Sequence, residues 1–262
     1  MSEVTTGETR TCEKCSKTYQ HVAWYWDEVG DQYDWNGSIQ HCPSCLLFVE
    51  EREKRERLAR EEEERREAKE RVAKVDWEKI VPPVYRETDI GHSNYPKEIH
   101  RMAIEWQNGK GANVSNQRLF LGLIGPSCKC KSRVVAQTVK RMIWAGKKCQ
   151  WVNAAKFQRL VQGQWNNDQA ESSSSTVGEL ARRDLASFQQ CDTLVLDDLG
   201  KGSLTETVAG ALYDLIEERS SQGRAMLWTS NASLDDLLSM LPKDCGWPIV
   251  RRLVDFSTII QL

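Results

Sequence analysis

Short apolar runs alternate with amphipathic stretches over the last two-thirds of the chain. The runs at 119–124, 149–153, 193–198, 225–228 and 257–262 have the length and composition of buried strands. Apolar residues recur at helical spacing at about 96–106, 134–142, 154–162, 180–188, 204–219 and 234–240. The pattern therefore predicts strands separated by helices over residues 81–262. The serine-rich stretch 166–176 between two of the helices is expected to be a mobile loop.

The stretch from 50 to 74 lacks such a pattern. Ten of its residues are acidic and ten are basic, and glutamate precedes arginine by four residues at several points. Its apolar residues are too few for a coiled-coil seam. We expect a charged, solvated single helix over 50–80, ended by Pro82-Pro83. A flexible polyampholyte tether is the alternative.

Two Cys-x-x-Cys pairs stand near the start of the chain, and between them lies an aromatic segment that predicts a hairpin. Zn²⁺ binds four thiolates tetrahedrally, and such a set leaves no open position for catalysis. Residues 1–49 are therefore predicted to form a structural zinc-binding module with the ligands Cys12, Cys15, Cys42 and Cys45. His21 and His41 are alternative ligands, and unliganded cysteines are the plainer reading.

Charge and composition indicate where the chain is expected to act and what it is expected to contact. The 36 Lys and Arg residues nearly balance the 38 Asp and Glu residues, so the net charge of -2 produces no global basic field. No apolar run reaches the ~18 residues of a membrane span, and the first residues do not form a signal peptide. The chain is therefore expected to be cytoplasmic, without membrane contact, and its nine cysteines to be metal ligands and thiols.

The strongest motif follows the run 119–124 and has the skeleton of a phosphate-binding loop. Lys131 would add a positive charge to the phosphates, Ser132 would bind Mg²⁺, and backbone N–H groups would face the phosphates. Cysteines stand where such loops use glycine, and a left-handed residue with a Cβ costs about 1–2 kcal/mol. The predicted nucleotide-binding residues here are Gly125, Pro126, Ser127, Cys128, Lys129, Cys130, Lys131 and Ser132.

Further polar residues stand at or near the ends of later predicted strands. Asp197 would hold Mg²⁺ and Asp198 would orient or deprotonate the attacking water. Asn231 would contact the γ-phosphate and the same water. Arg251 and Arg252 would stabilise transition-state charge, in cis or from a neighbouring subunit. Each of these assignments has a purely structural alternative. The two aspartates would then belong to an Asp-rich turn, the asparagine would start a turn, and the arginines would form salt bridges at a helix end.

These motifs, in this order and spacing, resemble the DnaC/DnaI-type helicase loaders and the related IstB-like transposition ATPases, which are AAA+ proteins. The resemblance covers about 81–262, and the zinc module with its charged helix is similar to the DnaI-type arrangement. It implies an α/β P-loop fold with a parallel sheet in the order 5-1-4-3-2. The chain is expected to have no C-terminal lid. The resemblance also implies ATP-dependent assembly around single-stranded DNA or a helicase ring.

The leading hypothesis is an ATPase of DNA replication that uses ATP, Mg²⁺ and Zn²⁺ and loads or remodels a replicative helicase through its zinc module. Single-stranded DNA and further copies of the chain are expected partners. One alternative is an IstB-like transposition regulator. The other is a non-hydrolysing adaptor whose cysteine-bearing loop binds nucleotide weakly or not at all. Tyr85 or Arg86 would border the adenine, and oxidation of the loop cysteines would block nucleotide entry.

Overall fold

The computed structural model describes residues 4–26, 32–34, 43–109, 118–166, 175–201 and 204–262. The chain divides into two compact units, Met1–Ala68 and Lys69–Leu262. Each unit is described by itself below. The predicted division into a zinc-binding module (1–49), a charged connector (50–80) and an ATPase domain (81–262) stays a prediction.

The first unit contains a three-stranded antiparallel sheet in the order β1-β2-β3, formed by Val4–Thr11, Thr18–Trp26 and Gln32–Asp34. Strands β2 and β3 pair Tyr25 with Tyr33, which confirms the aromatic hairpin. Strand β1 was not predicted. It pairs with β2 from Val4↔Trp24 to Thr11↔Thr18, so the first cysteine pair lies on the turn between them.

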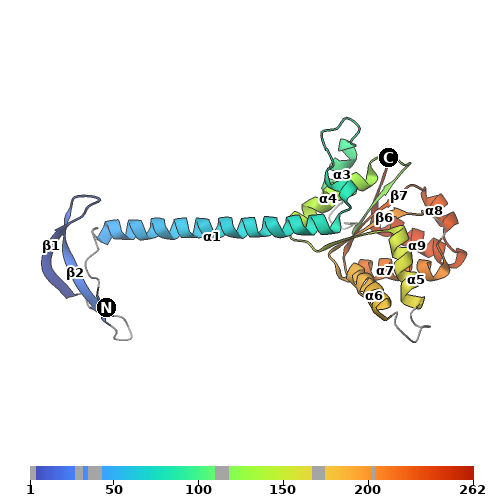
Figure 1. Ribbon diagram of the computed structural model, residues 1–262. Helices are drawn as coiled ribbons and strands as arrows, with labels where there is room; N and C mark the ends of the chain where they lie inside the picture. The colour runs from blue at the N-terminus through green and yellow to red at the C-terminus, as the bar shows by residue number, and fades with distance from the viewer. Residues whose placement is uncertain (1–3, 27–31, 35–42, 110–117, 167–174, 202–203) are drawn as a thin grey trace. The chain divides into compact units, whose positions relative to one another are not determined.

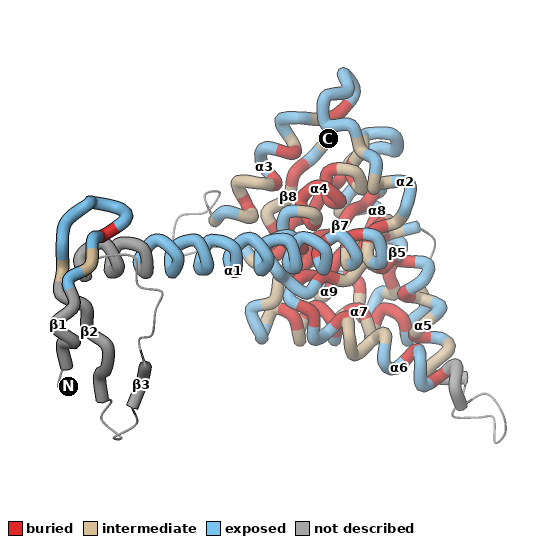
Figure 2. The backbone as a smooth tube through the Cα atoms, turned by 60° about the vertical axis from the view of Figure 1, so that its left-hand side comes forward, coloured by how far each residue is buried: buried red, intermediate tan, exposed pale blue. Residues whose placement is uncertain are grey.

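Helix α1 runs over Pro43–Ile80, which confirms the charged helix and starts it earlier than expected. Its residues 51–72 are all exposed, as the pale blue tube in Figure 2 shows. The ion pairs Arg52–Glu56 at 3.6 Å and Arg57–Glu61 at 3.9 Å place arginine before glutamate, the reverse of the expected order. Such exposed pairs contribute little, so the helix depends mainly on intrinsic propensity over this stretch.

The second unit is built on a five-stranded parallel sheet (Figure 1). Its strands are β4 (Phe120–Ile124), β5 (Cys149–Asn153), β6 (Thr193–Leu199), β7 (Ala225–Ser230) and β8 (Ser257–Gln261). The spatial order β5-β6-β7-β4-β8 is the predicted order 5-1-4-3-2 counted from the opposite edge. The predicted α/β fold with this parallel sheet is therefore confirmed.

The helices of this unit are α2 (Pro83–Arg86), α3 (Lys97–Gln107), α4 (Lys131–Trp144), α5 (Ala154–Asn166), α6 (Ser175–Gln190), α7 (Glu206–Ser221), α8 (Leu234–Met240) and α9 (Lys243–Phe256). Helices α2 and α9 were not predicted, and α9 contains Gly246 and Pro248, which disfavour a helix. Helices α5 and α6 extend into the expected loop 166–176, of which 167–174 lies outside the described residues.

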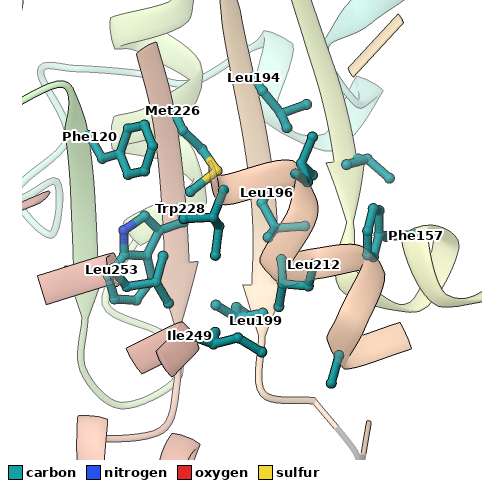
Figure 3. Close-up of a cluster of buried hydrophobic side chains, with 14 of the residues drawn as sticks. Phe120, Phe157, Leu194, Leu196, Leu199, Leu212, Met226, Trp228, Ile249 and Leu253 are labelled. Atoms are coloured by element: carbon teal, nitrogen blue, oxygen red, sulfur yellow. The ribbon is translucent and has the colours of Figure 1, made fainter. Parts of the chain in front are cut away.

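Successive apolar side chains of each strand point to opposite faces of the sheet, so the core consists of two clusters, one on each face. One face packs against α5, α6, α7 and α9, and Figure 3 shows part of this cluster, including Phe120, Leu196 and Trp228. The other face packs against α3, α4 and the end of α1. Ala73 and Trp77, which lie in the expected connector, are buried in this second cluster.

Candidate nucleotide-binding site

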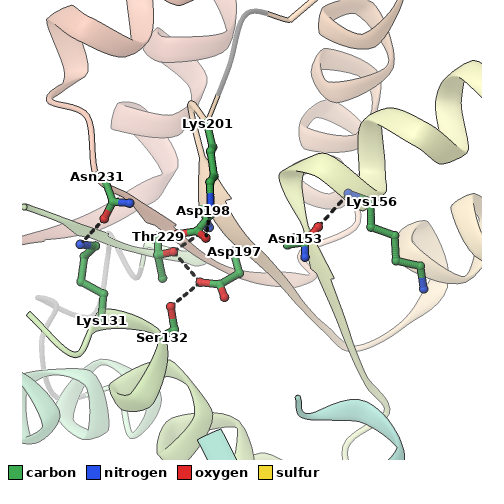
Figure 4. Close-up of polar contacts among 9 residues, drawn as sticks. All are labelled: Lys131, Ser132, Asn153, Lys156, Asp197, Asp198, Lys201, Thr229 and Asn231. Carbon is green, nitrogen blue, oxygen red and sulfur yellow. Dashed lines mark hydrogen bonds and ion pairs between the residues drawn. The ribbon is translucent and has the colours of Figure 1, made fainter. Parts of the chain in front are cut away.

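Successive side chains of a strand point to opposite faces of the sheet, and polar side chains of two strands thereby lie on the face that α4 covers. In β6, Leu194 and Leu196 belong to the opposite cluster, so Val195 and then Asp197 face α4. In β7 the same rule places Thr229 on that face. Asp197 Oδ1 accepts hydrogen bonds from Ser132 Oγ and from Thr229 Oγ1, both at 2.7 Å (Figure 4).

A bulge interrupts β6 at the two consecutive aspartates. Leu196 pairs with Trp228 and Leu199 pairs with Ser230, so Asp197 and Asp198 together lie opposite Thr229. Asp198 takes a left-handed conformation with φ 58°, and its N–H donates to Thr229 Oγ1 at 2.9 Å. Bulges redirect side chains beside functional sites. Here the bulge gives the two carboxylates different surroundings, with Asp197 buried and Asp198 partly exposed, 3.9 Å from Lys201 Nζ.

Lys131 is buried at the start of α4 and uses its three ammonium protons within the site. Its Nζ donates to Gly125 O and Pro126 O at 2.8 Å and to Asn231 Oδ1 at 2.7 Å. Burial lowers the pKa of Lys131, while the nearby Asp198 and Asp197 carboxylates oppose that shift. The lysine is therefore a desolvated cation held against the phosphate loop, where an anionic ligand would compensate its charge.

Asp197 is the buried carboxylate of the site, as Lys131 is its buried cation. Burial raises its pKa above the ordinary value, and the hydrogen bonds from Thr229 and Ser132 oppose the shift. A desolvated carboxylate beside a serine hydroxyl fits a hard divalent cation, because Mg²⁺ takes oxygen ligands and compensates buried negative charge. Ser132 and Asp197 thus lie together and have oxygen atoms of the kind that Mg²⁺ takes, and their binding of Mg²⁺ stays a prediction.

Two residues of the phosphate loop have left-handed backbone conformations. Cys128 has φ 66° and Cys130 has φ 59°, both left-handed. A Cβ added at Gly125 would lie 2.7 Å from Leu262 O, so this position excludes larger residues. Pro126, Ser127 and Lys129 are exposed on the loop. The cysteines therefore keep the loop conformation at a cost of about 1–2 kcal/mol each.

The structure does not bring Arg251 or Arg252 to this group. Arg251 Nε lies 3.5 Å from Asp255, and Arg252 pairs with Glu217 and lies over the Phe256 ring at 5.8 Å. Helix α9 ends where β8 begins, at the amino end of the parallel sheet, whereas the phosphate loop follows the carboxyl end of β4. Neither arginine therefore approaches the Lys131 group of its own chain.

Tyr85 and Arg86 point to different surroundings. Tyr85 packs against Trp151 with ring centroids 5.7 Å apart, and burial raises its pKa while the nearby Ser132 side chain opposes the rise. Arg86 instead donates to Val81 O at 2.7 Å and to Glu78 O, at the end of α1. Tyr85 alone of the two borders the site. Its ring contact is with Trp151, and the adenine contact stays a prediction.

The predicted zinc ligands are described only in part. Cys12 is buried and Cys15 exposed on a tight turn, where Cys12 N–H donates to Lys17 O at 2.9 Å and Ser16 N–H to Cys12 O at 2.8 Å. Cys45 lies in the first turn of α1, while Cys42 and His41 lie outside the described residues. Among the described side chains, no three His, Cys, Asp or Glu residues gather as metal ligands. The zinc site therefore stays a prediction.

The sequence matches no protein-family model and no curated protein at a significant level. Solved structures are similar in fold. DnaI superposes with a TM-score of 0.51 at 16% identity, over 67% of this chain and 88% of DnaI. DnaA from Aquifex aeolicus, bound to AMPPCP, has a TM-score of 0.51 at 11% identity, over 70% of this chain and 51% of DnaA.

A third similar structure, a DNA replication initiation factor, has a TM-score of 0.52 at 11% identity, over 70% of this chain. This chain spans about half the length of that factor and of the Aquifex DnaA. These likenesses establish the α/β fold with a five-stranded parallel sheet that the motifs implied. Across the described residues, no helix is long and apolar enough to cross a membrane.

Proposed function

We propose that this chain, whose second unit has the AAA+ type of P-loop fold, binds Mg²⁺·ATP and hydrolyses it. The observation that carries the proposal is the convergence of Lys131, Ser132, Asp197 and Asn231 at the carboxyl end of a parallel sheet. Ligands of open α/β sheets bind at that edge, and a loop followed by a helix N-terminus faces phosphates with N–H groups.

Each residue then has a distinct task. Lys131 exchanges its contacts with loop carbonyls for contacts with phosphate oxygens. Ser132 and Asp197 hold Mg²⁺, which supplies electrostatic stabilisation of the transferring phosphoryl group. Asp198, on the exposed side of the bulge, orients or deprotonates the attacking water, and Asn231 contacts the same water. Catalysis of this kind depends mainly on positioning and electrostatics, which a rigid sheet edge provides.

The test is calorimetry with Mg²⁺·ATP on the wild-type protein, Lys131→Ala and Lys147→Ala. Lys147 is exposed in the turn after α4 and serves as a charge-matched control. We expect Lys131→Ala to weaken binding at least tenfold, about 1.4 kcal/mol, and Lys147→Ala to bind as the wild type does. Equal affinities of all three proteins, or no binding by any, would contradict the proposal.

We further propose that the ATPase acts in DNA replication, where it loads or remodels a replicative helicase through its N-terminal unit. The support is the likeness in fold to DnaI and DnaA together with the resemblance of the zinc module and charged helix to the DnaI-type arrangement. The zinc ligands would be Cys12, Cys15, Cys42 and Cys45. Further copies of the chain and single-stranded DNA are the other partners.

This role is tested with a purified ring helicase of the replicative type. We expect the chain to form a complex with the helicase, Mg²⁺·ATP to change its stability, and the double variant Cys12→Ser/Cys15→Ser to lose both one bound zinc per chain and the complex. Since neither arginine approaches its own site, Arg251 would act on a neighbouring copy. Arg251→Ala would then lower hydrolysis without changing ATP affinity. A variant that lacks zinc but still binds the helicase would refute the role of the module.

A non-hydrolysing adaptor is a second candidate, favoured by the left-handed cysteines of the phosphate loop. The calorimetric series separates the two when Cys130→Gly is added. Binding by the wild type supports the ATPase. Binding by Cys130→Gly alone supports the adaptor, because relief of the strained position then restores a site that the cysteine had disabled.

A further inference from the structure

Two of the nine cysteines lie on the phosphate loop itself. Among the residues that the structure describes, four non-glycine residues have positive φ, and Cys128 and Cys130 are two of them. Both are thiols, Cys128 exposed and Cys130 half-buried. By contrast, Cys149 and Cys191 are buried in the core, and burial raises the pKa of Cys149 to about 12. Reactivity of a cysteine requires an accessible thiol, so the loop pair is chemically different from the core pair.

We propose that Cys128 and Cys130 form a reversible disulfide, and that this oxidation closes the phosphate loop to nucleotide. The inference rests on the proposed function, since it concerns the regulation of the same ATP site. Two virtual bonds of about 3.8 Å separate the two Cα atoms, so a bend at Lys129 keeps them within the roughly 4.4–6.8 Å that a disulfide spans.

The chemistry requires a two-electron oxidant, for which we name hydrogen peroxide. The exposed Cys128 thiolate attacks one peroxide oxygen, which forms a sulfenic acid and releases hydroxide that takes up a proton to become water. The Cys130 thiol then attacks the Cys128 sulfur, which forms the S–S bond and releases a second water molecule. Two thiols and one peroxide thus give one disulfide and two waters. A dithiol reverses the change by exchange.

The consequence for nucleotide follows from the loop backbone. The N–H groups that would face the phosphates belong to the same residues as the thiols, and Cys130 directly precedes α4. A disulfide needs Cβ atoms about 3.8 Å apart, which fixes the backbone on both sides of Lys129. The oxidised loop therefore loses the freedom to fit phosphates. Bound nucleotide covers the loop, so it should also protect the thiols.

The disulfide can be mapped directly, because Lys129 separates the two cysteines. Trypsin cleaves after Arg118, Lys129 and Lys131, so the peptides 119–129 and 130–131 stay joined only through a disulfide. After mild peroxide, the full-length protein should give the joined peptide without reductant and lose it with dithiothreitol. Mg²⁺·ATP should slow its formation at least fivefold. Cys128→Ser should give none, and Cys245→Ser, altered on α9, should behave as the wild type does.

The second readout is Mg²⁺·ATP affinity by calorimetry before and after peroxide. We expect at least tenfold weaker binding by the oxidised protein, recovery with dithiothreitol, and no peroxide effect in Cys128→Ser even where other cysteines are oxidised. Absence of the joined peptide, or a joined peptide with unchanged ATP affinity, would overturn the inference. Failure of the proposed function looks different, because the reduced protein would then bind no ATP before any peroxide is added.

Discussion

Thr229 bonds both consecutive aspartates of β6, one through its hydroxyl proton and the other through an oxygen lone pair. It donates to Asp197 Oδ1 at 2.7 Å and accepts from Asp198 N–H at 2.9 Å. It is also fully buried. The hydroxyl therefore holds the bulge that orients the two carboxylates, although the sequence motifs drew attention to Asn231 and not to Thr229. Thr229 lies near the carboxyl end of the strand that precedes Asn231, and this position was the signal that could have revealed it.

Replacing Thr229 by valine should test this role, since valine has nearly the same shape and lacks the hydroxyl. We expect a stability loss of about 1–3 kcal/mol, because the half-buried Asp198 N–H and the buried Asp197 carboxylate each lose a partner, and at least a tenfold fall in kcat. Urea denaturation and steady-state hydrolysis measure the two effects. Thr229→Ser keeps the hydroxyl and should recover most of the activity. Similar kcat values for Thr229→Val and Thr229→Ser would exclude a role of the hydroxyl in catalysis.

Asp197 gives a prediction in which stability and activity change in opposite directions. Its folded-state pKa lies above the unfolded value, so the native state keeps the proton longer. Stability therefore falls as the pH rises from about 3.9 through the raised folded-state pKa, and the ionised carboxylate destabilises the fold at higher pH. The asparagine amide oxygen can still accept from Ser132 and Thr229 without that charge.

We accordingly expect Asp197→Asn, without nucleotide or Mg²⁺, to be at least as stable as the wild type at pH 8, with the difference shrinking toward pH 4. Mg²⁺-dependent hydrolysis should fall at least a hundredfold, because the variant lacks the anionic ligand. Thermal unfolding across this pH range and hydrolysis assays provide the measurements. A variant that is clearly less stable at pH 8 than at pH 4, relative to the wild type, would contradict this account of the buried charge.

Between neighbouring strands, Gly122 of β4 and Trp228 of β7 share one space. The two residues are paired in register, and a Cβ at Gly122 would lie 2.5 Å from Trp228 Cζ2. Trp228 is fully buried, and its Nε1 donates to Ser257 Oγ of β8 at 2.8 Å. The missing side chain of Gly122 thus lets one indole of β7 lie against β4 and reach β8.

Gly122→Ala should therefore destabilise the protein by about 1–3 kcal/mol through overpacking. The matched control is Gly210→Ala in the middle of α7, where an added Cβ meets nothing within 4 Å. That change should stabilise the protein by about 0.5–1 kcal/mol, because alanine favours the helix. Urea denaturation of both variants measures the difference. Two changes of the same sign would show that the indole can move out of the way.

For the chain as a whole, the second unit begins within α1 and not after it. Trp77 is 7% exposed, its ring lies 6.3 Å from that of Trp144 in an edge-to-face arrangement, and Lys140 Nζ lies 5.6 Å from it. Ala73 is buried in the same cluster. The last turns of the charged helix therefore supply part of the core of the second unit.

Two truncations test this boundary. A chain that begins at Lys69 should fold and bind Mg²⁺·ATP with the affinity of the full chain. A chain that begins at Val81 should lose about 3–5 kcal/mol, comparable to deletion of a buried tryptophan side chain. Urea denaturation compares the two, and Trp77→Ala in the full chain should reproduce most of the loss. Equal stability of both truncated chains would place the boundary after α1.

Much of the fold could be predicted from local patterns. The strand 149–153 and the helix 234–240 were predicted at the bounds that the structure has, because their apolar spacing and flanking polar residues are local signals. Helix α9 was missed, since Gly246 and Pro248 disfavour a helix locally while packing of Ile249, Val250 and Leu253 on the sheet favours it. In this segment tertiary packing outweighed the low local helix propensity.

The sequence alone determined the strands, the phosphate loop and its left-handed cysteines, because each depends on residues close in the chain. Only the tertiary structure decided which strands are neighbours, and therefore that Thr229 lies opposite Asp197 and Asp198 across the bulge. It also decided that Arg252 pairs with Glu217 of α7. Alternation along a strand divides its residues between two faces, but the partners on each face come from distant segments, and only the folded chain brings them together.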